Sequence, residues 1–277
     1  MKKQYALIGK TLGYSHSPLI HNTLFKALGV EAEYGLLELP PESLAAGLER
    51  VRADYCGCNV TVPYKQAVIP FLDEISGEAA AVGAVNTIVN RNGRLSGLNT
   101  DGEGFMRSLP VSADELKGKR VLVCGAGGAA RVIVYRLLKA GARVEIQNRT
   151  AANAESLLHE LSAHAPAENG AYVEHASGAY FLCVNTTPVG MLTSQGSSPI
   201  SAEQAAKCEY VYDCIYNPAQ TKLLCDAQTA GCKCTGGFGM LWRQAVLAQE
   251  YWGYFYTEAM LEAAQKHVWQ AVCGNET

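Results

Sequence analysis

The stretch RVLVCGAGGAARVIVYRLLKAGARVEIQNRT, residues 120–150, decides the fold. It contains a short apolar strand, a glycine-rich turn, a long apolar helical segment and a second strand, which is the size of one βαβ unit. The turn fits the pattern G-x-G-x-x-G/A. Gly125 allows the tight turn, Gly127 lets the backbone approach a pyrophosphate, and Ala130 lets the helix pack closely on the strand. This context favours a dinucleotide-binding domain over the alternative, a tight glycine turn without a ligand.

The residues that end the second strand indicate which dinucleotide binds. A protein that prefers NAD usually carries Asp or Glu there, but this strand is followed by Asn148, Arg149 and Thr150. Glu145 comes earlier, within the strand. An arginine can bind a phosphate through two parallel hydrogen bonds and can stack on adenine. The sequence therefore predicts NADP, recognised by its 2′-phosphate; the alternative is that Arg149 is a solvated surface residue.

The first hundred residues alternate between strand and helix patterns, which is typical of a parallel α/β domain. Asn92-Gly93 predicts the turn of a hairpin within residues 87–99. We expect strands at residues 4–9, 31–39 and 55–62, and helices at residues 17–29, 41–52 and 64–76.

Beyond the glycine turn we expect strands at residues 179–187 and 209–216, and a helical pattern over residues 240–272. The fold class predicted is α/β, with an N-terminal substrate domain, a Rossmann-type NADP-binding domain, parallel sheets and a cleft between the domains. The first domain would cover residues 1–102 and be completed by C-terminal helices within 238–277. The second would cover residues 103–237.

Composition narrows the class of partner. The net charge of −3 argues against a nucleic-acid or membrane surface partner, and no apolar run approaches the roughly 18 residues of a membrane helix. The apolar run near the N-terminus is too short for a signal peptide, so we expect a cytoplasmic protein that acts on a small molecule, as a monomer or a homodimer. The ten cysteines lack the paired spacing of zinc sites and are interpreted as structural thiols, with no metal site.

Two residues at the ends of predicted elements are candidates for the chemistry. A nicotinamide cofactor supplies hydride, so the protein must place a carbonyl or alcohol and move a proton. Lys65 follows the strand that ends in NVTVP, and Asp101 follows the predicted hairpin. A lysine beside a carboxylate can pass a proton to and from a substrate oxygen. From these residues alone, a solvated Lys65 remains the favoured alternative.

Several motifs together resemble the shikimate dehydrogenase family, from about residue 5 to residue 250. GKTLGYSHSPLIHN (9–22) is similar to the substrate loop of that family, and NVTVPYK (59–65), GAVNT (83–87) and NTDG (99–102) are similar to its substrate and catalytic motifs. GAGGAAR and NRT are similar to its NADP motifs. The second half carries NTTPVGM (185–191), DCIYNPAQT (213–221) and GMLWRQA (239–245).

The resemblance implies a role for each matching position in the substrate site. Ser15 and Ser17 would hydrogen-bond the substrate carboxylate, with help from Tyr216, because hydroxyl groups donate without adding a buried charge. Lys65 and Asp101 would form the catalytic pair at the reacting oxygen. The residues that would hold the ring hydroxyls are Asn59, Thr61, Asn86 and Gln244.

The resemblance also implies the cofactor site and the activity. The 2′-phosphate would be held by Asn148, Arg149 and Thr150. The pyrophosphate would lie on Gly125, Ala126, Gly127, Gly128 and Ala129, and the nicotinamide end would be lined by Thr186, Ile215, Gly237 and Met240. The implied reaction is the reversible, NADPH-dependent reduction of 3-dehydroshikimate to shikimate for aromatic amino acid synthesis. The alternatives are a quinate dehydrogenase, a relative acting on an amino-substituted ring, and a non-catalytic NADP-binding sensor.

Overall fold

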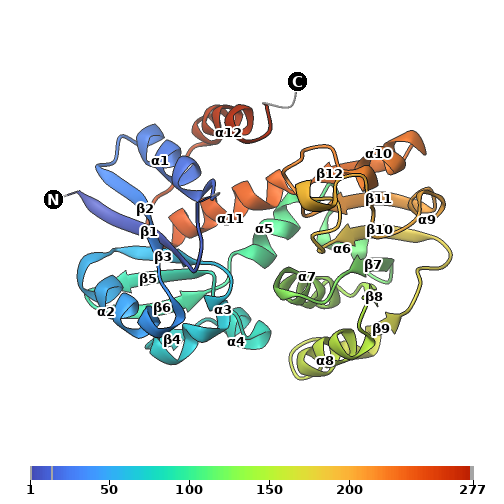
Figure 1. The fold of residues 1–277 in the computed structure, drawn as a ribbon, viewed down its shortest axis with the longest axis horizontal. Helices are drawn as coiled ribbons and strands as arrows, with labels where there is room; N and C mark the ends of the chain where they lie inside the picture. The colour runs from blue at the N-terminus through green and yellow to red at the C-terminus, as the bar shows by residue number, and fades with distance from the viewer. Residues whose placement is uncertain (1, 14, 275–277) are drawn as a thin grey trace. The chain divides into compact units, whose positions relative to one another are not determined.

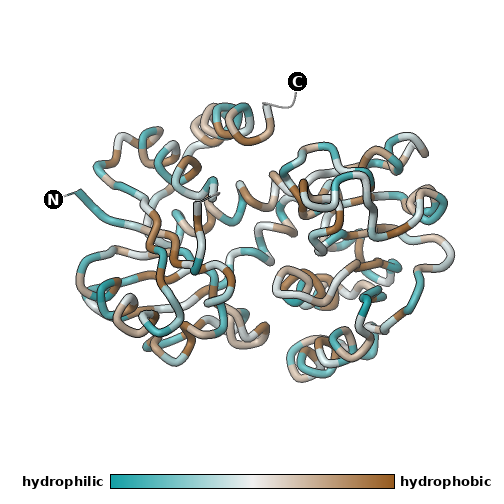
Figure 2. Tube along the Cα trace, viewed as in Figure 1, coloured by the Kyte–Doolittle hydropathy of each residue, from teal (hydrophilic) through white to brown (hydrophobic). Residues whose placement is uncertain are grey.

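The chain folds into two compact units in a computed structural model, which describes residues 2–13 and 15–274 (Figure 1). The first unit comprises Met1–Thr100 and Gln244–Val272, and the second comprises Asp101–Arg243 and Cys273–Thr277. Each unit is built around its own six-stranded sheet. Figure 2 shows hydrophobic stretches along the strands of these sheets and hydrophilic ones in peripheral loops. The α/β architecture predicted from the alternating pattern is confirmed.

The first sheet is parallel except for one strand. Its order is β2-β1-β3-β5-β6-β4, and only β5 runs against its neighbours. That strand belongs to the predicted hairpin, whose turn residues Asn92 and Gly93 have positive φ values of 54° and 87°, as a tight hairpin turn requires. The strands are β1 (Lys3–Gly9), β2 (Ala32–Glu38), β3 (Gly57–Val60), β4 (Glu74–Ile75), β5 (Thr87–Arg91) and β6 (Arg94–Leu98).

Helices cover both faces of the first sheet because its strands alternate apolar side chains between the faces. In β1, Ala6 and Ile8 join the core under α2 (Leu44–Asp54), α3 (Tyr64–Ala67) and α4 (Gly77–Val82). Tyr5 and Leu7 face the opposite core. That core also contains side chains of α1 (Ser17–Ala27), of α11 (Phe238–Tyr251) and of the segment that leads to α12 (Glu258–Cys273).

Two helices are shorter than the sequence pattern predicted. The expected helix at 64–76 is wrong beyond Ala67, where the chain continues as a short 3₁₀ turn (Ile69–Phe71) and the two-residue strand β4. Pro70 explains the break, because proline cannot donate the backbone hydrogen bond of a helix interior. The C-terminal helical pattern is likewise interrupted between Tyr251 and Glu258, where Gly253 has φ 93°.

The second sheet is wholly parallel, with the order β12-β11-β10-β7-β8-β9. Counted from β7, this is the strand order 3-2-1-4-5-6 of a dinucleotide-binding fold, read from the other edge. Its strands are β7 (Arg120–Cys124), β8 (Arg143–Gln147), β9 (Gly170–Val173), β10 (Tyr180–Asn185), β11 (Cys208–Asp213) and β12 (Lys233–Gly236). Its helices are α5 (Asp101–Ser108), α6 (Ala113–Leu116), α7 (Gly128–Lys139), α8 (Ala151–Leu161), α9 (Ala202–Ala205) and α10 (Lys222–Thr229).

All ten cysteines are free thiols, and five of them are buried. Three buried ones, Cys124, Cys183 and Cys208, lie in the core beneath α9 and α10, where they act as small apolar side chains. Across the described part of the chain, each helix is too short or too polar to span a lipid bilayer.

The contact between Gly57 and Trp252 gives a test of how the C-terminal segment packs on the first sheet. Trp252 Nε1 donates to the Ile88 carbonyl oxygen at 3.0 Å, and a Cβ at Gly57 would collide with the indole ring and with that oxygen. We predict that Gly57→Ala lowers the free energy of unfolding by roughly 1–3 kcal/mol, as overpacking does. Urea unfolding measures the change.

Gly35→Ala is the matched control, because Gly35 lies in β2, another strand of the same sheet, and an added Cβ there meets nothing within 4 Å. The control should be neutral or slightly stabilising. Equal losses in the two variants would contradict the packing of Trp252 over β3.

His21 generates a prediction about acid stability. Its side chain is 0% exposed, its ring stacks on Tyr34 at 4.2 Å, and Nδ1 lies 3.1 Å from Gln249 Nε2. Burial lowers the pKa of His21 to about 3. The folded state therefore keeps His21 neutral while the unfolded state binds a proton below the ordinary pKa of about 6.5, so stability falls as pH drops from about 6.5 towards 3.

We expect the titration of His21 to lower the free energy of unfolding by about 1.4 kcal/mol for each pH unit in that range. Unfolding free energies of the wild type and of His21→Gln, measured at pH 7, 6 and 5, should converge as the pH falls. A constant difference between the two proteins would show that His21 does not titrate in this way.

Candidate functional site

The first unit gathers buried polar side chains where β3 ends and β5 begins. Asn59 and Asn86 are both buried, although each carries a full carboxamide. Asn59 Nδ2 donates to the Asn86 carbonyl oxygen at 3.2 Å and to Thr87 Oγ1 at 3.0 Å. Asn59 Oδ1 accepts from the Tyr34 hydroxyl at 2.8 Å. The amide is therefore held in one orientation, since buried polar groups must find partners.

Asn86 connects this cluster to the residue before Asp101. Its Oδ1 accepts from the Thr100 N–H at 2.8 Å and from the Thr87 hydroxyl at 3.0 Å, and its Nδ2 lies 3.0 Å from Thr100 Oγ1. Val85, the preceding residue, donates its N–H to the Lys65 carbonyl oxygen at 2.7 Å. Two consecutive residues thus fix the backbone at positions 65 and 100, and Asp101 follows directly as the first residue of α5.

Lys65 lies in α3, which the turn after β3 leads into. The Thr61 N–H donates to the Ile8 carbonyl oxygen at 2.9 Å, and Tyr64 donates its hydroxyl to the Leu39 carbonyl oxygen at 2.5 Å. A Cβ at Gly9 would come within 2.8 Å of Thr61 Cγ2, so the end of β1 and this turn pack closely. The predicted substrate residue Thr61 is thereby held beside the beginning of the serine loop.

The serine loop follows β1 and leads into α1. Ser15 donates its N–H to the Leu12 carbonyl oxygen at 2.8 Å, and Ser15 Oγ accepts the Ser17 N–H at 3.2 Å. Both serines are half-buried. Leu12, earlier in the same segment, donates its N–H to Glu38 Oε1 at 2.6 Å.

The remaining two substrate candidates divide between the units. Gln244 lies on α11 in the first unit and is half-buried. Tyr216 lies in the second unit, after β11, where burial raises the pKa of its hydroxyl. The first unit therefore contains the predicted substrate residues Ser15, Ser17, Asn59, Thr61, Asn86 and Gln244, whereas the second unit contains Tyr216 and the residues predicted to hold the cofactor.

The glycine turn occupies the switch point of the second sheet, between β7 and β10, where open α/β sheets bind ligands. Gly125 has φ 109°, and a Cβ there would lie 2.5 Å from Thr186 Oγ1. Thr186 follows β10 and donates its hydroxyl to the Cys124 carbonyl oxygen at 2.7 Å. Gly127 and Gly128 are exposed at the start of the 12-residue helix α7, so free N–H groups and the positive end of the helix dipole face outwards.

The segment after β8 carries the three residues predicted to hold the 2′-phosphate, Asn148, Arg149 and Thr150. Arg149 and Thr150 are exposed, and Asn148 Nδ2 donates to the Thr150 carbonyl oxygen at 2.8 Å, which closes a short turn. Glu145 is engaged elsewhere: its Oε1 accepts from Arg120 Nε at 3.0 Å, and its Oε2 accepts from the Tyr180 hydroxyl at 2.6 Å. Both carboxylate oxygens of Glu145 therefore already accept hydrogen bonds from other side chains.

The predicted nicotinamide residues after β11 also lie together within the second unit. Gly237 donates its N–H to the Ile215 carbonyl oxygen at 3.0 Å, and any side chain at position 237 would collide with the Cys214 carbonyl group. The Met240 backbone hydrogen-bonds the Tyr212 hydroxyl, which is also 2.7 Å from Ser108 Oγ. The close approach of the Cys214 carbonyl group therefore explains why position 237 is a glycine.

Sequence reasoning missed Asn185 and Asp213, two buried polar residues that organise this side of the second sheet. Asp213 accepts hydrogen bonds from Asn185 Nδ2 at 3.0 Å, from the Ile215 N–H at 3.0 Å and from the Thr221 hydroxyl at 2.7 Å. Burial raises the pKa of Asp213, and these hydrogen bonds partly offset the rise. The available signal was a polar residue at the carboxyl end of each of two apolar strands.

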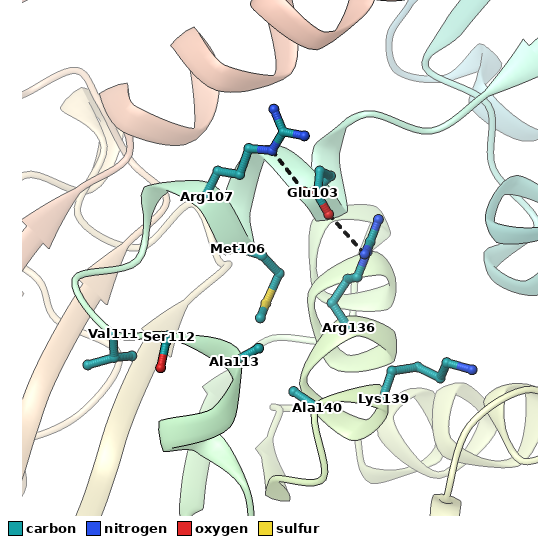
Figure 3. A pocket seen from close by; sticks show the side chains of 9 residues that line it. All are labelled: Glu103, Met106, Arg107, Val111, Ser112, Ala113, Arg136, Lys139 and Ala140. Atoms are coloured by element: carbon teal, nitrogen blue, oxygen red, sulfur yellow. Dashed lines mark hydrogen bonds and ion pairs between the residues drawn. The ribbon is translucent and has the colours of Figure 1, made fainter.

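An ion-pair bridge ties α5 to α7 (Figure 3). Glu103 accepts from Arg107 Nε at 2.8 Å on its own helix and from Arg136 at 3.0 Å on α7. A surface hollow of about 400 Å³ lies beside this bridge. The helix that begins at Asp101 is therefore linked to the helix that follows the glycine turn.

Comparison with known proteins identifies the family. A family model described as the shikimate dehydrogenase substrate binding domain matches residues 7–88, and one described as shikimate / quinate 5-dehydrogenase matches residues 110–174. A shikimate dehydrogenase (NADP(+)) of Geobacillus kaustophilus is 44% identical over 256 residues, which covers 91% of this chain and 93% of the relative.

Two solved structures are similar to this chain over nearly its whole length. A shikimate 5-dehydrogenase of Thermus thermophilus, determined with NADP(H) and shikimate, has a TM-score of 0.85, 34% identity, and coverage of 96% of this chain and 99% of that one. A 5-ketofructose reductase of Gluconobacter has a TM-score of 0.85, 30% identity, and coverage of 97% and 99%. On these matches, the chain belongs to the shikimate dehydrogenase family.

Proposed function

We propose that the chain catalyses the reversible, NADPH-dependent reduction of 3-dehydroshikimate to shikimate, with Lys65 and Asp101 as its proton-handling pair. One observation carries the pair: Val85 and Asn86, two consecutive residues, hydrogen-bond the backbone at Lys65 and at Thr100. The hydrogen bonds fix the backbone at Lys65 itself and at the residue before Asp101. The NADP-dependent shikimate dehydrogenases among the relatives support the reaction.

The substrate would be held mainly by hydrogen bonds from neutral side chains. Ser15 and Ser17 would bind the carboxylate, with Tyr216 at the same end, because hydroxyl groups satisfy a carboxylate without adding charge. The carboxamide and hydroxyl side chains of four residues in the first unit would bind the ring hydroxyls. The residues assigned to those hydroxyls are Asn59, Thr61, Asn86 and Gln244.

Two features of the second unit support NADP binding, one at the pyrophosphate and one at the 2′-phosphate. A side chain at position 125 would collide with Thr186, so the turn keeps a backbone surface, from Gly125 to Ala129, for the pyrophosphate. Arg149 and Thr150 are exposed for the 2′-phosphate beside Asn148, and the β8 carboxylate of Glu145 is committed to other partners. The residues assigned to the nicotinamide end are Thr186, Ile215, Gly237 and Met240.

The two candidate catalytic side chains would divide the work at the reacting oxygen. NADPH, when bound, supplies the hydride for the carbonyl carbon. The Lys65 ammonium would stabilise the negative charge that develops on the ring oxygen and take part in its protonation, and Asp101 would hold the ammonium in place. General acid catalysis of this kind contributes about 10²–10⁴ in rate.

The 5-ketofructose reductase fold makes reduction of a different polyhydroxy ketone the second candidate function. Initial rates with shikimate and with quinate, each with NADP and NAD, and with 5-ketofructose and NADPH, separate the candidates. We expect turnover chiefly with shikimate and NADP. NADP binding without turnover on any of these substrates would instead support a sensor.

The remaining proposals concern the assembly and location of the enzyme. We propose that residues 1–102 with the helices of 238–277 form the substrate domain and that residues 103–237 form the NADP domain. We further propose that the protein works in the cytoplasm as a monomer or a homodimer.

Lys65→Ala should lower kcat for shikimate oxidation by about 10²–10⁴, because the general acid and base at the ring oxygen is lost. The affinity for NADPH, measured by fluorescence titration, should stay unchanged. Lys26→Ala is the control, since Lys26 is an exposed lysine of α1 in the same unit. Turnover of the Lys65 variant within a few-fold of the wild type would refute the catalytic assignment.

Arg149→Ala should raise the KM for NADP by about tenfold to a hundredfold, because charge-assisted hydrogen bonds to a phosphate are lost. The KM for NAD, which lacks that phosphate, should change little. The matched control is Arg143→Ala, an exposed arginine at the opposite end of β8. Equal effects on NADP and NAD would exclude a role for Arg149 at the 2′-phosphate.

A further inference from the structure

Tyr34 lies in β2 with its side chain buried in the core beneath α1. It is 2% exposed, and it stands beside Tyr5 in the parallel register of β1 and β2. Its ring stacks on His21 with an interplanar angle of 7° and lies 6.2 Å from the Trp252 ring. Aromatic packing of this kind holds a ring in one place and leaves the hydroxyl as its only polar atom.

The backbone of Tyr34 is fixed as firmly as its ring. Asn22 of α1 donates Nδ2 to the Tyr34 carbonyl oxygen at 2.9 Å, and Asn22 Oδ1 accepts the Tyr34 N–H at 2.9 Å. His21 and Asn22 are adjacent in α1, so one helix turn holds the tyrosine through both its ring and its peptide groups. The hydroxyl position is therefore set by α1, the helix that begins at Ser17.

The Tyr34 hydroxyl reaches two residues that we assign to the substrate. It donates to Asn59 Oδ1 at 2.8 Å, and the side chain of Ser17 is near enough to the same hydroxyl to lower its pKa. Burial raises the pKa of Tyr34 well above its ordinary value, and Ser17 only partly offsets the rise. The hydroxyl thus keeps its proton at neutral pH and acts as a donor to Asn59.

The other atoms of the Asn59 carboxamide leave it little freedom. Nδ2 uses its two protons on the Asn86 carbonyl oxygen and on Thr87 Oγ1. Oδ1 accepts from the Tyr34 hydroxyl, and the buried His21 side chain also interacts with Asn59. An amide oriented in this way can offer only its oxygen, and not its nitrogen, to a ligand hydroxyl.

We propose that Tyr34 is a positioning residue, whose hydroxyl orients Asn59 towards a ring hydroxyl of the substrate and couples that side chain to Ser17 at the substrate carboxylate. The proposal rests on the proposed function of the first unit. It adds to that function a reason for substrate selectivity. The buried Tyr34 hydroxyl would orient Asn59 so that Asn59 binds a ligand hydroxyl that donates a hydrogen bond.

The test is Tyr34→Phe, which removes the hydroxyl and keeps the ring. We expect the KM for shikimate to rise about tenfold, the size of one lost hydrogen bond, while the KM for NADP stays the same. A shikimate analogue that lacks the ring hydroxyl bound by Asn59 should show no difference between the variant and the wild type. Both the 4-deoxy and the 5-deoxy analogue are therefore assayed.

Tyr5→Phe is the matched control. Tyr5 is the register neighbour of Tyr34, is equally buried, and loses one hydrogen bond of 3.1 Å, to the Tyr254 hydroxyl. The control should lower stability without changing either KM. If Tyr34→Phe behaves like this control, or if it raises KM equally for shikimate and both deoxy analogues, the positioning role is overturned.

A double-mutant cycle adds a second readout. In an Asn59→Ala background, Tyr34→Phe should have no further effect on the KM for shikimate, because the two residues act in series. Additive effects would overturn the proposal. Wild-type turnover of shikimate is measured first, so that an inactive wild type rejects the proposed function, whereas an active wild type with an unaltered Tyr34 variant rejects only this inference.

Discussion

The Asn86 carboxamide is the constraint on which the first unit depends. Its oxygen accepts the Thr100 N–H, and the backbone carbonyl group of the same residue accepts from Asn59, so the ends of β3, β5 and β6 converge on one residue. All of these groups are buried, and an unpaired polar atom among them would carry a large desolvation cost. Asn86 fixes the backbone at Thr100, the residue before Asp101, and its neighbour Val85 hydrogen-bonds the Lys65 carbonyl oxygen.

The second unit reaches a similar result with a carboxylate. Asp213 is buried and is stabilised by three hydrogen bonds from neutral groups, including the one from Asn185. These bonds shape the loops after β10 and β11, which carry Thr186 and Ile215. Both units thus use a buried polar side chain at a strand end to hold loops in which our candidate ligand-binding residues lie.

Much of this arrangement could be predicted from the sequence because its signals are local. The glycine turn at Gly125, the Asn92-Gly93 hairpin and the missing acidic residue after β8 are all read from neighbouring residues, and the order of the second sheet agrees with them. The expected helix at 64–76 failed because apolar spacing outweighed Pro70 in the prediction.

The partners of the buried polar residues could not be predicted, because they depend on strand order. Tyr34 reads as an ordinary core aromatic in an alternating strand, and nothing near it in the sequence points to Asn59, which is 25 residues away. Asp213 and Asn185 are likewise joined only by the pairing of β10 with β11. The resemblance to the family named candidate site residues but not the residues that hold them in place.

The Asn22 clamp has a consequence for association between molecules. β2 is an edge strand of the first sheet, and an edge strand exposes backbone groups to which a strand from another molecule can add. The Asn22 carboxamide occupies both the N–H and the carbonyl oxygen of Tyr34, at the centre of that edge. A foreign strand could not pair in register there without first displacing a side chain of α1, so the helix protects the sheet against aggregation through this edge.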